Sequence, residues 1–192
     1  VDLDGTVTEV NTVSNLNVNR LRPDTDSTKG RFLFSGDNGA NKIRYGMGEI
    51  DSTSNRMIQW LGGFSVSANG AANDIACIGD PDGSGNGADY AVVGNEESDG
   101  FVLQLQVDET LGSASYNVGK TWSRTLGSCT FNSVVAENYT NPNWVIGNTN
   151  RKIHVVGQAG ANGVIVQYDN TGAIQWQNSI GFMGTENLVA VI

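Results

Sequence analysis

Short hydrophobic runs, each closed by a glycine, recur along the chain. They read RFLFSG, DYAVVG and KIHVVG and lie at Arg31–Gly36, Asp89–Gly94 and Lys152–Gly157. Each run has the length of one β-strand, and no segment keeps apolar residues at the i, i+3, i+4, i+7 spacing of a helix. The pattern therefore predicts an all-β chain.

A longer pattern follows each of these runs. It consists of a hydrophobic strand, an Asp, a polar turn and a second strand that carries a Trp. The three copies span Tyr45–Gly63, Gly100–Gly127 and Gly163–Gly181, with the shared Trp at Trp60, Trp122 and Trp176. Self-similarity on this scale indicates stacked or radially arranged repeats. We expect each copy to form a β-hairpin.

A third repeated stretch completes the unit, with the copies NDIACIGD, FNSVVAEN and ENLVAVI. One unit then contains four short strands, as a blade of a β-propeller does. We expect full blades at about 14–64, 73–127 and 131–181. The predicted fold class is an all-β propeller of four-stranded antiparallel blades.

Both ends of the chain resemble parts of a blade. Residues 1–11 carry an Asp4-Gly5 turn between apolar and β-branched residues, as in the hairpin of the third and fourth strands. Residues 186–192 resemble a first strand. Propellers close with about four to eight blades. Either a longer polypeptide or several copies of the chain would therefore complete the ring, and we favour the longer polypeptide.

Composition narrows the function classes. The 192 residues include 25 Gly and 3 Pro, which favours many tight turns over a disordered linker. The net charge of −9 disfavours binding to nucleic acid or to anionic lipid, since both need clustered Lys and Arg. No stretch approaches the roughly 20 apolar residues that cross a bilayer, so we expect no membrane insertion. Free thiols are expected at Cys77 and Cys129, although their spacing leaves a disulfide open.

The third unit carries a resemblance to a known repeat. Its key residues are Val155-Val156-Gly157, Val164–Asp169, Gly172, Ile174-Gln175-Trp176 and Gly181. They resemble the SBBP-like β-propeller repeat, whose consensus reads roughly IAVDSSGNVYVTG … AFVAKLDSSGTLQWQRTLGG. The similarity extends less closely from about Arg31 to the end of the chain.

Repeats of this type occur in bacterial extracellular proteins and in virion structural proteins of marine phages, especially tailed phages of cyanobacteria. The Gln-Trp pair in an Asn/Ser/Thr-rich background is most similar to the phage versions. The resemblance implies a scaffold or recognition role in a virion or another extracellular setting. A fold by itself fixes no function.

One loop suggests a metal. Residues 79–94, GDPDGSGNGADYAVVG, resemble the calcium-binding loop of integrin-type propellers. Calcium takes several oxygen ligands, which Asp and Asn in a Gly-rich loop supply. Two residues depart from that pattern: a Ser stands where an Asp is expected, and the last Asp is one residue late. An Asp/Gly-rich turn is the alternative, and no other cofactor is expected. The candidate ligands are Asp80, Asp82, Ser84, Asn86 and Asp89, with Asp80 and Asp82 favoured.

The tryptophans divide into two kinds. Those at the shared repeat position are expected to fill the packing between blades. Trp144 lies outside the repeat, in the polar loop NYTNPNW, together with Tyr139 and Asn141. An aromatic ring among Asn and Thr can stack on a sugar, so these three are candidate ligand-binding residues. The alternative is a loop that packs on itself.

We expect no enzymatic activity. A Ser-His-Asp or Cys-His site would have to use His154, the only His of the chain, and zinc sites need several His or Cys ligands. His154 is expected to be packed or hydrogen-bonded within its blade instead.

These patterns predict a non-enzymatic structural or recognition module of a larger extracellular assembly, most simply a phage virion protein of the tail, baseplate or fibre. Such a module would mediate assembly or host-surface contact. Its partners would be other structural proteins, copies of itself or cell-surface glycans. An oligomeric, carbohydrate-binding propeller is the alternative.

Overall fold

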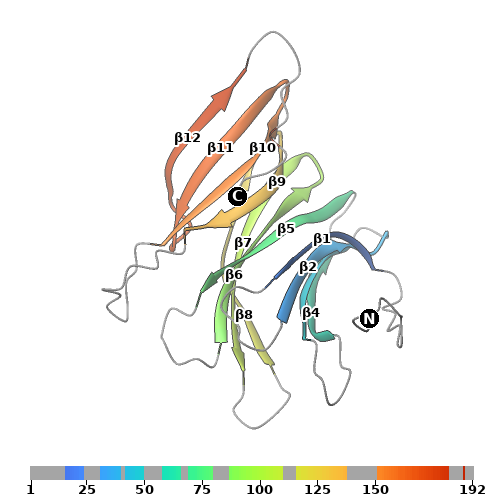
Figure 1. Cartoon of the computed structure of the whole chain (residues 1–192). Helices are drawn as coiled ribbons and strands as arrows, with labels where there is room; N and C mark the ends of the chain where they lie inside the picture. Colours follow the sequence, from blue (N-terminus) through green and yellow to red (C-terminus); the bar gives the residue numbers. More distant parts are fainter. Residues whose placement is uncertain are drawn as a thin grey trace, which may run out of the picture.

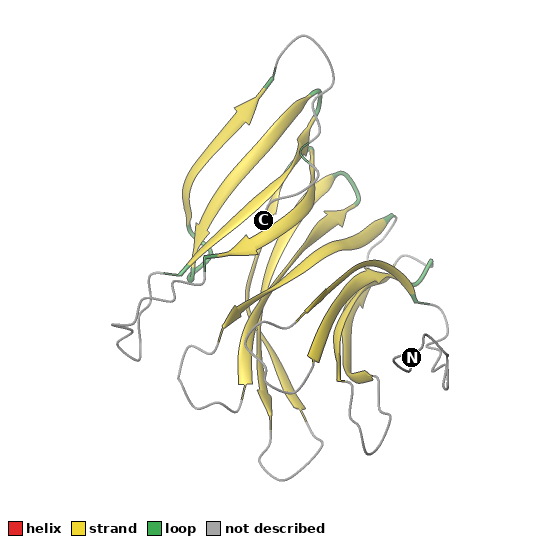
Figure 2. Cartoon of the chain, viewed as in Figure 1, coloured by secondary structure: helices red, strands yellow, loops and turns green. Residues whose placement is uncertain are grey.

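The computed structural model describes residues 16–23, 31–39, 42–49, 58–65, 69–79, 87–109, 116–137, 151–181 and 188 (Figures 1 and 2). The described residues form twelve β-strands and no helix, so none of them forms a helix that could cross a membrane. The strands are β1 (Asn17–Pro23), β2 (Arg31–Asp37), β3 (Lys42–Glu49), β4 (Ile58–Ser65), β5 (Gly70–Gly79), β6 (Gly87–Glu96), β7 (Asp99–Glu109), β8 (Tyr116–Leu126), β9 (Cys129–Ala136), β10 (Lys152–Ala159), β11 (Asn162–Asp169) and β12 (Ile174–Ile180).

The strands form three four-stranded sheets in sequence order. We call β1–β4 the first sheet, β5–β8 the second and β9–β12 the third; within each, consecutive strands pair antiparallel. The sheets spread like a fan, with their first strands β1, β5 and β9 side by side (Figure 1). The all-β prediction with four-stranded antiparallel units is confirmed. The sheets are blade-like and do not close into a ring.

The first strand of every sheet contains a β-bulge at an Asn. Asn19, Asn73 and Asn132 are each skipped in the register with the second strand. A bulge bends the strand and leaves one residue without a partner in the ladder. The Asn side chain is thereby freed to face a neighbouring sheet.

A glycine opposite each bulge explains the Gly that closes every hydrophobic run. A Cβ at Gly36, Gly94 or Gly157 would lie 1.8–2.0 Å from a backbone carbonyl oxygen of the bulged strand. Only a residue without a Cβ permits this approach. The Asn and the Gly are therefore two halves of one backbone arrangement.

Two hydrophobic cores lie between the sheets. The core between the first and second sheets includes Leu33, Met47 and Tyr90, and the core between the second and third includes Ala91, Phe131 and Val166. Neighbouring residues of β6 alternate between the two cores, which is why DYAVVG reads as a continuous apolar run rather than as alternation. Cys77 and Cys129 are free thiols, as the sequence predicted.

Candidate functional site

Most of the ligand residues proposed from the sequence lie outside the described residues, namely Asp80, Asp82, Ser84, Asn86, Tyr139, Asn141 and Trp144. Asp89 is described and lies on β6, where it is only 7% exposed. Its Oδ2 accepts a hydrogen bond of 2.8 Å from Nε2 of Gln104 on β7. The described residues contain no group of three or more His, Cys, Asp or Glu that could hold a metal ion.

The most extensive polar cluster joins the first strands of all three sheets at Asp74 of β5. This carboxylate is fully buried. Arg22 of β1 binds it in bidentate fashion, with Nε 2.7 Å from Oδ1 and Nη2 2.5 Å from Oδ2. Nε of Arg20 lies 3.5 Å from Oδ1. Two cations therefore compensate a charge that would be costly to bury alone.

The third sheet contributes to the same cluster. Ser133 Oγ and the Val134 amide of β9 donate to Oδ2 of Asp74 at 2.7 and 3.0 Å. The Ile75 amide donates to Oδ1 at 2.9 Å. Both carboxylate oxygens are thus held by several donors, which fits a structural link between sheets better than a general base.

The bulged Asn residues form a second link, and it has a direction. Asn19 Nδ2 donates to the carbonyl of Ala72 at 3.2 Å, and Asn73 Nδ2 donates to the carbonyl of Phe131 at 2.8 Å. Asn132 Nδ2 donates to the carbonyl of Leu188 at 2.9 Å. The first strand of each sheet therefore donates to the segment that comes directly after that sheet in the chain: β1 to β5, β5 to β9, and β9 to Leu188.

Farther from the first strands, Trp122 and Arg124 of β8 hold the turn between β11 and β12. The indole Nε1–H of Trp122 donates to the Asn170 carbonyl at 2.9 Å. Arg124 donates from Nε to the Gly172 carbonyl at 3.0 Å and from Nη2 to the Thr171 carbonyl at 3.1 Å. Trp122 is 8% exposed, so the packing role predicted for the repeated Trp is confirmed here. The same prediction is wrong for Trp176, which is 43% exposed, and the side chain of Trp60 lies outside the described part of the chain.

The turn held by Trp122 is organised by Asp169. Its Oδ1 accepts from the Thr171 and Ala173 amides, and its Oδ2 accepts from Gln175 Nε2 at 2.7 Å. Burial pushes the pKa of Asp169 up, but hydrogen bonds from Thr171, Ala173 and Gln175 outweigh it, so the pKa is lowered overall. Gly172 ends the turn at φ 76°, where an added Cβ would lie 2.7 Å from the Trp122 ring.

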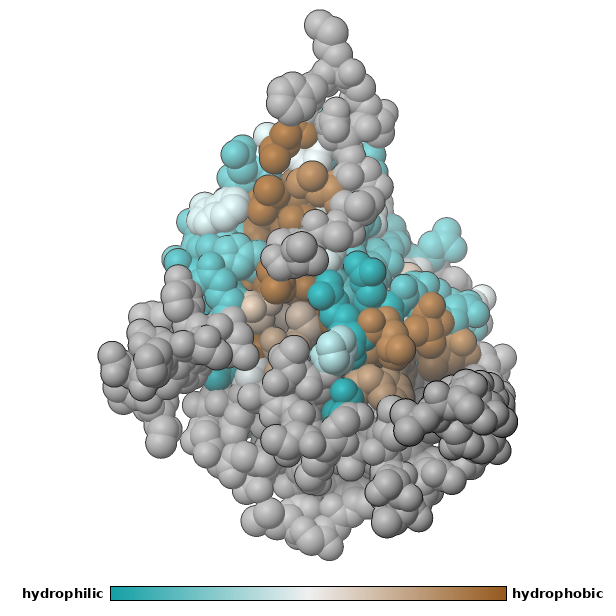
Figure 3. Space-filling view, viewed as in Figure 1, coloured by the Kyte–Doolittle hydropathy of each residue, from teal (hydrophilic) through white to brown (hydrophobic). Residues whose placement is uncertain are grey.

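The exposed large hydrophobic side chains of the described residues lie on the two outer sheets. Val18 and Leu21 of β1 are 53% and 61% exposed, and Ile174 and Trp176 of β12 are 46% and 43% exposed. Hydrophobic side chains reach the surface on the side of β1 in the space-filling view (Figure 3). Contiguous exposed apolar groups of this kind mark interaction surfaces.

The Asn bulges provide a common reference position, so residues of one sheet can be matched to their equivalents in the others. The exposed side chains of β1 are equivalent to buried ones. Val18, one residue before its Asn, corresponds to Ala72 and Phe131; Leu21, two residues after it, corresponds to Ile75 and Val134. All four of these counterparts are fully buried between sheets. Trp176 likewise corresponds to Trp122, since each pairs with a Gln of the preceding strand.

His154 lies on the third sheet close to Trp176. Its Nε2 is 2.7 Å from Oε1 of Glu137, and its ring centroid is 6.3 Å from that of Trp176. The hydrogen-bonded role predicted for this His is confirmed. Its equivalent on β6, Ala91, contributes to the core that faces the next sheet.

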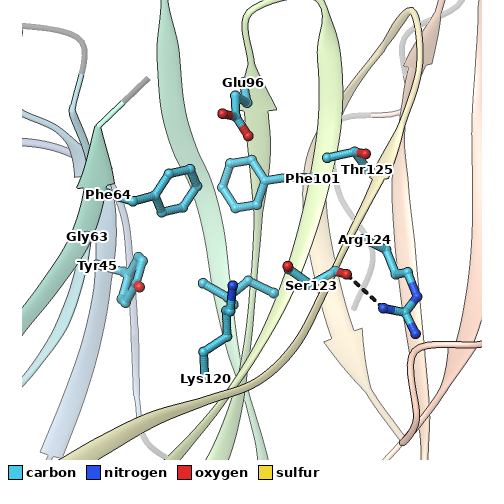
Figure 4. Close-up of a pocket in the computed structure, with 10 residues that line it drawn as sticks. Tyr45, Gly63, Phe64, Glu96, Phe101, Lys120, Ser123, Arg124 and Thr125 are labelled. Carbon is cyan, nitrogen blue, oxygen red and sulfur yellow. Dashed lines mark hydrogen bonds between the residues drawn. The ribbon is translucent and has the colours of Figure 1, made fainter. Parts of the chain in front are cut away.

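A pocket of about 400 Å³ opens between the first and second sheets. Figure 4 shows Phe64 and Tyr45 of the first sheet facing Phe101 of the second. The rings of Phe64 and Phe101 meet edge to face, with centroids 5.5 Å apart. These aromatic rings give the pocket an apolar wall.

Polar groups of the second sheet line the rest of this pocket, among them Glu96, Lys120, Ser123 and Thr125. Gly62 and Gly63 of β4 stand where the next sheet has Arg124 and Thr125. At these two positions the first sheet therefore has no side chain like that of Arg124 to bridge its junction. An apolar wall with charged and hydroxyl groups suits a small amphipathic ligand.

Tyr168 is a buried polar group of a different kind. Its hydroxyl has no hydrogen-bond partner among the described residues, and its ring centroid is 6.1 Å from that of Trp122. Burial is the main cause that raises its pKa to about 12. A phenol with so high a pKa is a poor nucleophile near neutral pH.

The Asp74 cluster and the Asn links were not predicted, although the sequence holds signals for both. An Asn recurs at the same place in NRLR, NDIA and NSVV. Asp74 is the only charged residue of its strand, GAANDIACIG, and two Arg stand in the corresponding first strand, NVNRLRP. A lone carboxylate in an apolar strand signals a buried partner of opposite charge.

Comparison with models of known protein families gives no match, and comparison with curated proteins gives none either.

Proposed function

We propose that the chain is a non-enzymatic β-propeller module of a larger extracellular assembly, such as a phage virion, where it mediates assembly or host-surface contact. Support for the propeller comes from three consecutive four-stranded sheets joined through their first strands, and from the resemblance to SBBP-like repeats. Propellers keep only short, protected edges by repeating such sheets around an axis.

The observation that carries the proposal is the location of the exposed hydrophobic side chains. Val18, Leu21 and Trp176 lie on the outer sheets at positions whose counterparts are buried at the junctions between sheets. A protein that presents such surfaces gains stability when another structural unit covers them. This favours a part in an assembly over an isolated module.

The proposal is tested on the native source. An antibody raised against the recombinant chain is used to follow the native protein through purification of extracellular particles. The intact mass of the native polypeptide is measured on the same material. We expect the chain to sediment with the particles and to stay with them in high salt, since an apolar contact is not screened. Detection only as free protein would contradict the proposal.

The pocket between the first and second sheets favours one alternative, an oligomeric carbohydrate-binding propeller. Its aromatic rings can stack on the apolar face of a sugar while Lys120 and Ser123 bind hydroxyl groups. A glycan array with the wild type and with Phe64→Ala tests this; Gln177→Ala, an exposed change on β12, is the matched control. Binding at micromolar affinity that only Phe64→Ala abolishes would establish the pocket. Binding lost instead on Trp144→Ala would place the sugar at the polar loop.

A further inference from the structure

We infer that the open face of the third sheet, around Trp176, binds the segment Asp2-Leu3-Asp4-Gly5 of a second copy of this chain, a segment that lies outside the described residues. The inference rests on the proposed propeller architecture and names one partner for one of its open faces. It follows from the contact between Trp122 of the second sheet and a turn of the third sheet.

Trp122, the buried counterpart of Trp176, shows which kind of segment covers a Trp at this position. Trp122 is covered by the turn Asp169–Gly172, which presents outward carbonyls to Trp122 and Arg124 and a glycine to the ring. An Asp at the first position closes such a turn through its carboxylate, and a Gly at the fourth lets the indole approach. The required occupant is therefore an Asp-x-x-Gly turn.

Trp176 has the same place in its sheet, and none of the described residues covers it with such a turn. It pairs with Gln167 as Trp122 pairs with Gln104, yet it is 43% exposed, and its neighbour Ile174 is 46% exposed. A Trp of this kind is a typical anchor of a protein interface.

Near the first strands, part of this face is already covered by Leu188, which follows β12 in the chain. Leu188 accepts the hydrogen bond from Asn132. A Cβ on Gly163 would lie 2.8 Å from Leu188 Cγ, much as one on Gly100 would lie 2.9 Å from Phe131 Cδ2. Leu188 thus packs on the third sheet as Phe131 packs on the second. The part around Trp176 receives no equivalent contact from the residues that the structure describes, and Trp176 is 43% exposed.

The chain itself contains a fitting segment. VDLDGTV, residues 1–7, matches YDNTGAI, residues 168–174, in its leading hydrophobic residue, its Asp-x-x-Gly and the hydrophobic residue two places after the Gly. The other Asp-x-x-Gly stretches, at residues 80–83 and 82–85, lack such flanks. In the fan the first and third sheets lie on opposite sides of the second (Figure 1). We therefore assign the occupant to a second copy, which makes the contact head to tail.

Complementation of two defective copies tests a head-to-tail contact directly. Trp176→Arg removes the receiving face, and the double variant Asp2→Ala/Gly5→Val removes the turn. Mass is measured by light scattering over a concentration series, and the melting temperature reports whether each variant folds. Thr121→Arg, an exposed change on β8, is the control.

We expect the wild type and Thr121→Arg to show masses above 20.3 kDa and to dissociate on dilution. Each interface variant should have a dissociation constant raised about tenfold or more, and an equal mixture of the two should recover a dimer, because one intact face meets one intact turn. A monomeric wild type, interface variants that associate normally, or a mixture that stays monomeric would each overturn the inference.

These outcomes can be distinguished from those that test the proposed function. A monomeric chain that is nevertheless found in particles would end the inference and leave the function standing. An oligomer absent from every particle would do the reverse.

Discussion

Trp122 and Trp176 occupy the same position in adjacent sheets, yet one is 8% exposed and the other 43%. The difference arises because the turn Asp169–Gly172 covers Trp122, and the Asn170 carbonyl of that turn accepts a hydrogen bond from the indole N–H. The difference in exposure between these two Trp side chains therefore shows how much a following sheet buries.

The two tryptophans make a matched pair for mutation. We expect Trp122→Ala to lower the free energy of unfolding by about 3 to 5 kcal/mol, as for other buried aromatic residues. Trp176→Ala should cost less than about 1 kcal/mol in the monomer. Urea unfolding measured at concentrations that keep the protein monomeric checks both, and equal losses would contradict the assignment of Trp122 to the junction.

Removal of the Asp74 carboxylate should be severe. Asp74→Ala leaves Arg22 buried in part without its partner and removes an acceptor from Ser133 and Val134, which predicts a loss of about 3 to 5 kcal/mol. Asp37→Ala is the control, since the hydrogen bonds that its Oδ1 accepts from Asn17 and from the Gly39 amide are both exposed and should each be worth at most about 1 kcal/mol. Chemical denaturation compares the two; similar losses would mean that the cluster does not join the sheets.

The glycines opposite the bulges should resist substitution. Gly157→Ala would place a Cβ 2.0 Å from the Thr130 carbonyl oxygen, so the first two strands of the third sheet must separate. Gly119→Ala, where no atom lies within 4 Å of the added Cβ, should instead be neutral or slightly stabilising. Melting temperatures of the two variants provide the test, and a tolerated Gly157→Ala would show that the bulge is not required.

Tyr168 gives a prediction for alkaline pH. Its pKa is about 12 in the folded chain and near 10.0 when unfolded, so the unfolded state ionises first. Stability attributable to this residue is complete below about pH 10 and is lost as the pH rises toward 12. Tyr168→Phe should unfold less readily than wild type above pH 10 and be neutral or stabilising by about 1 kcal/mol at pH 7, because the hydroxyl has no partner among the described residues. A large loss at neutral pH would show that the hydroxyl is hydrogen-bonded.

Asp169 gives the opposite sign at acidic pH. Its folded pKa lies below the unfolded value of 3.8, so its contribution is complete above that value and is lost as the pH falls through the folded pKa. The gap in stability between wild type and Asp169→Ala should be constant from about pH 5 to 8 and should narrow below about pH 4. Thermal unfolding across this range measures the gap; a gap independent of pH would mean that the charge of Asp169 does not hold the turn.

The loop 79–94 permits a simple test of calcium. If Asp80 and Asp82 bind calcium, the ion should raise the melting temperature, and Asp80→Asn/Asp82→Asn should remove that rise. An unchanged melting temperature in calcium supports the turn interpretation.

Local chemistry was enough to predict the strands. Apolar runs closed by Gly, Asp-containing turns and a repeated Trp specify four antiparallel strands, because each acts within one sheet. Contacts between sheets were not predictable in the same way. The partners of Asp74, for example, lie on β1 and β9, far away in sequence, and are brought together only by the stacking of the sheets.

The same limit applies to the candidate site. Gly63 lines the pocket without a side chain that could fill it, and the residues opposite belong to the second sheet. A sequence does not show which residues face each other across two sheets, so the pocket could not be predicted from it. The loop residues chosen from the sequence, such as Trp144, were chosen by composition, which carries no information about what lies opposite them.

The one-way hydrogen bonds of Asn19, Asn73 and Asn132 bear on how such a chain can evolve. Each unit brings its own donor for the unit after it and its own acceptor for the unit before it. In-frame duplication or deletion of a whole unit would leave these Asn links chemically complete, whereas removal of the first or the second unit would break the Arg22–Asp74 pair. The Asn joints therefore permit the number of units to change in a single genetic step, and the charged joint at Asp74 would require compensating substitutions.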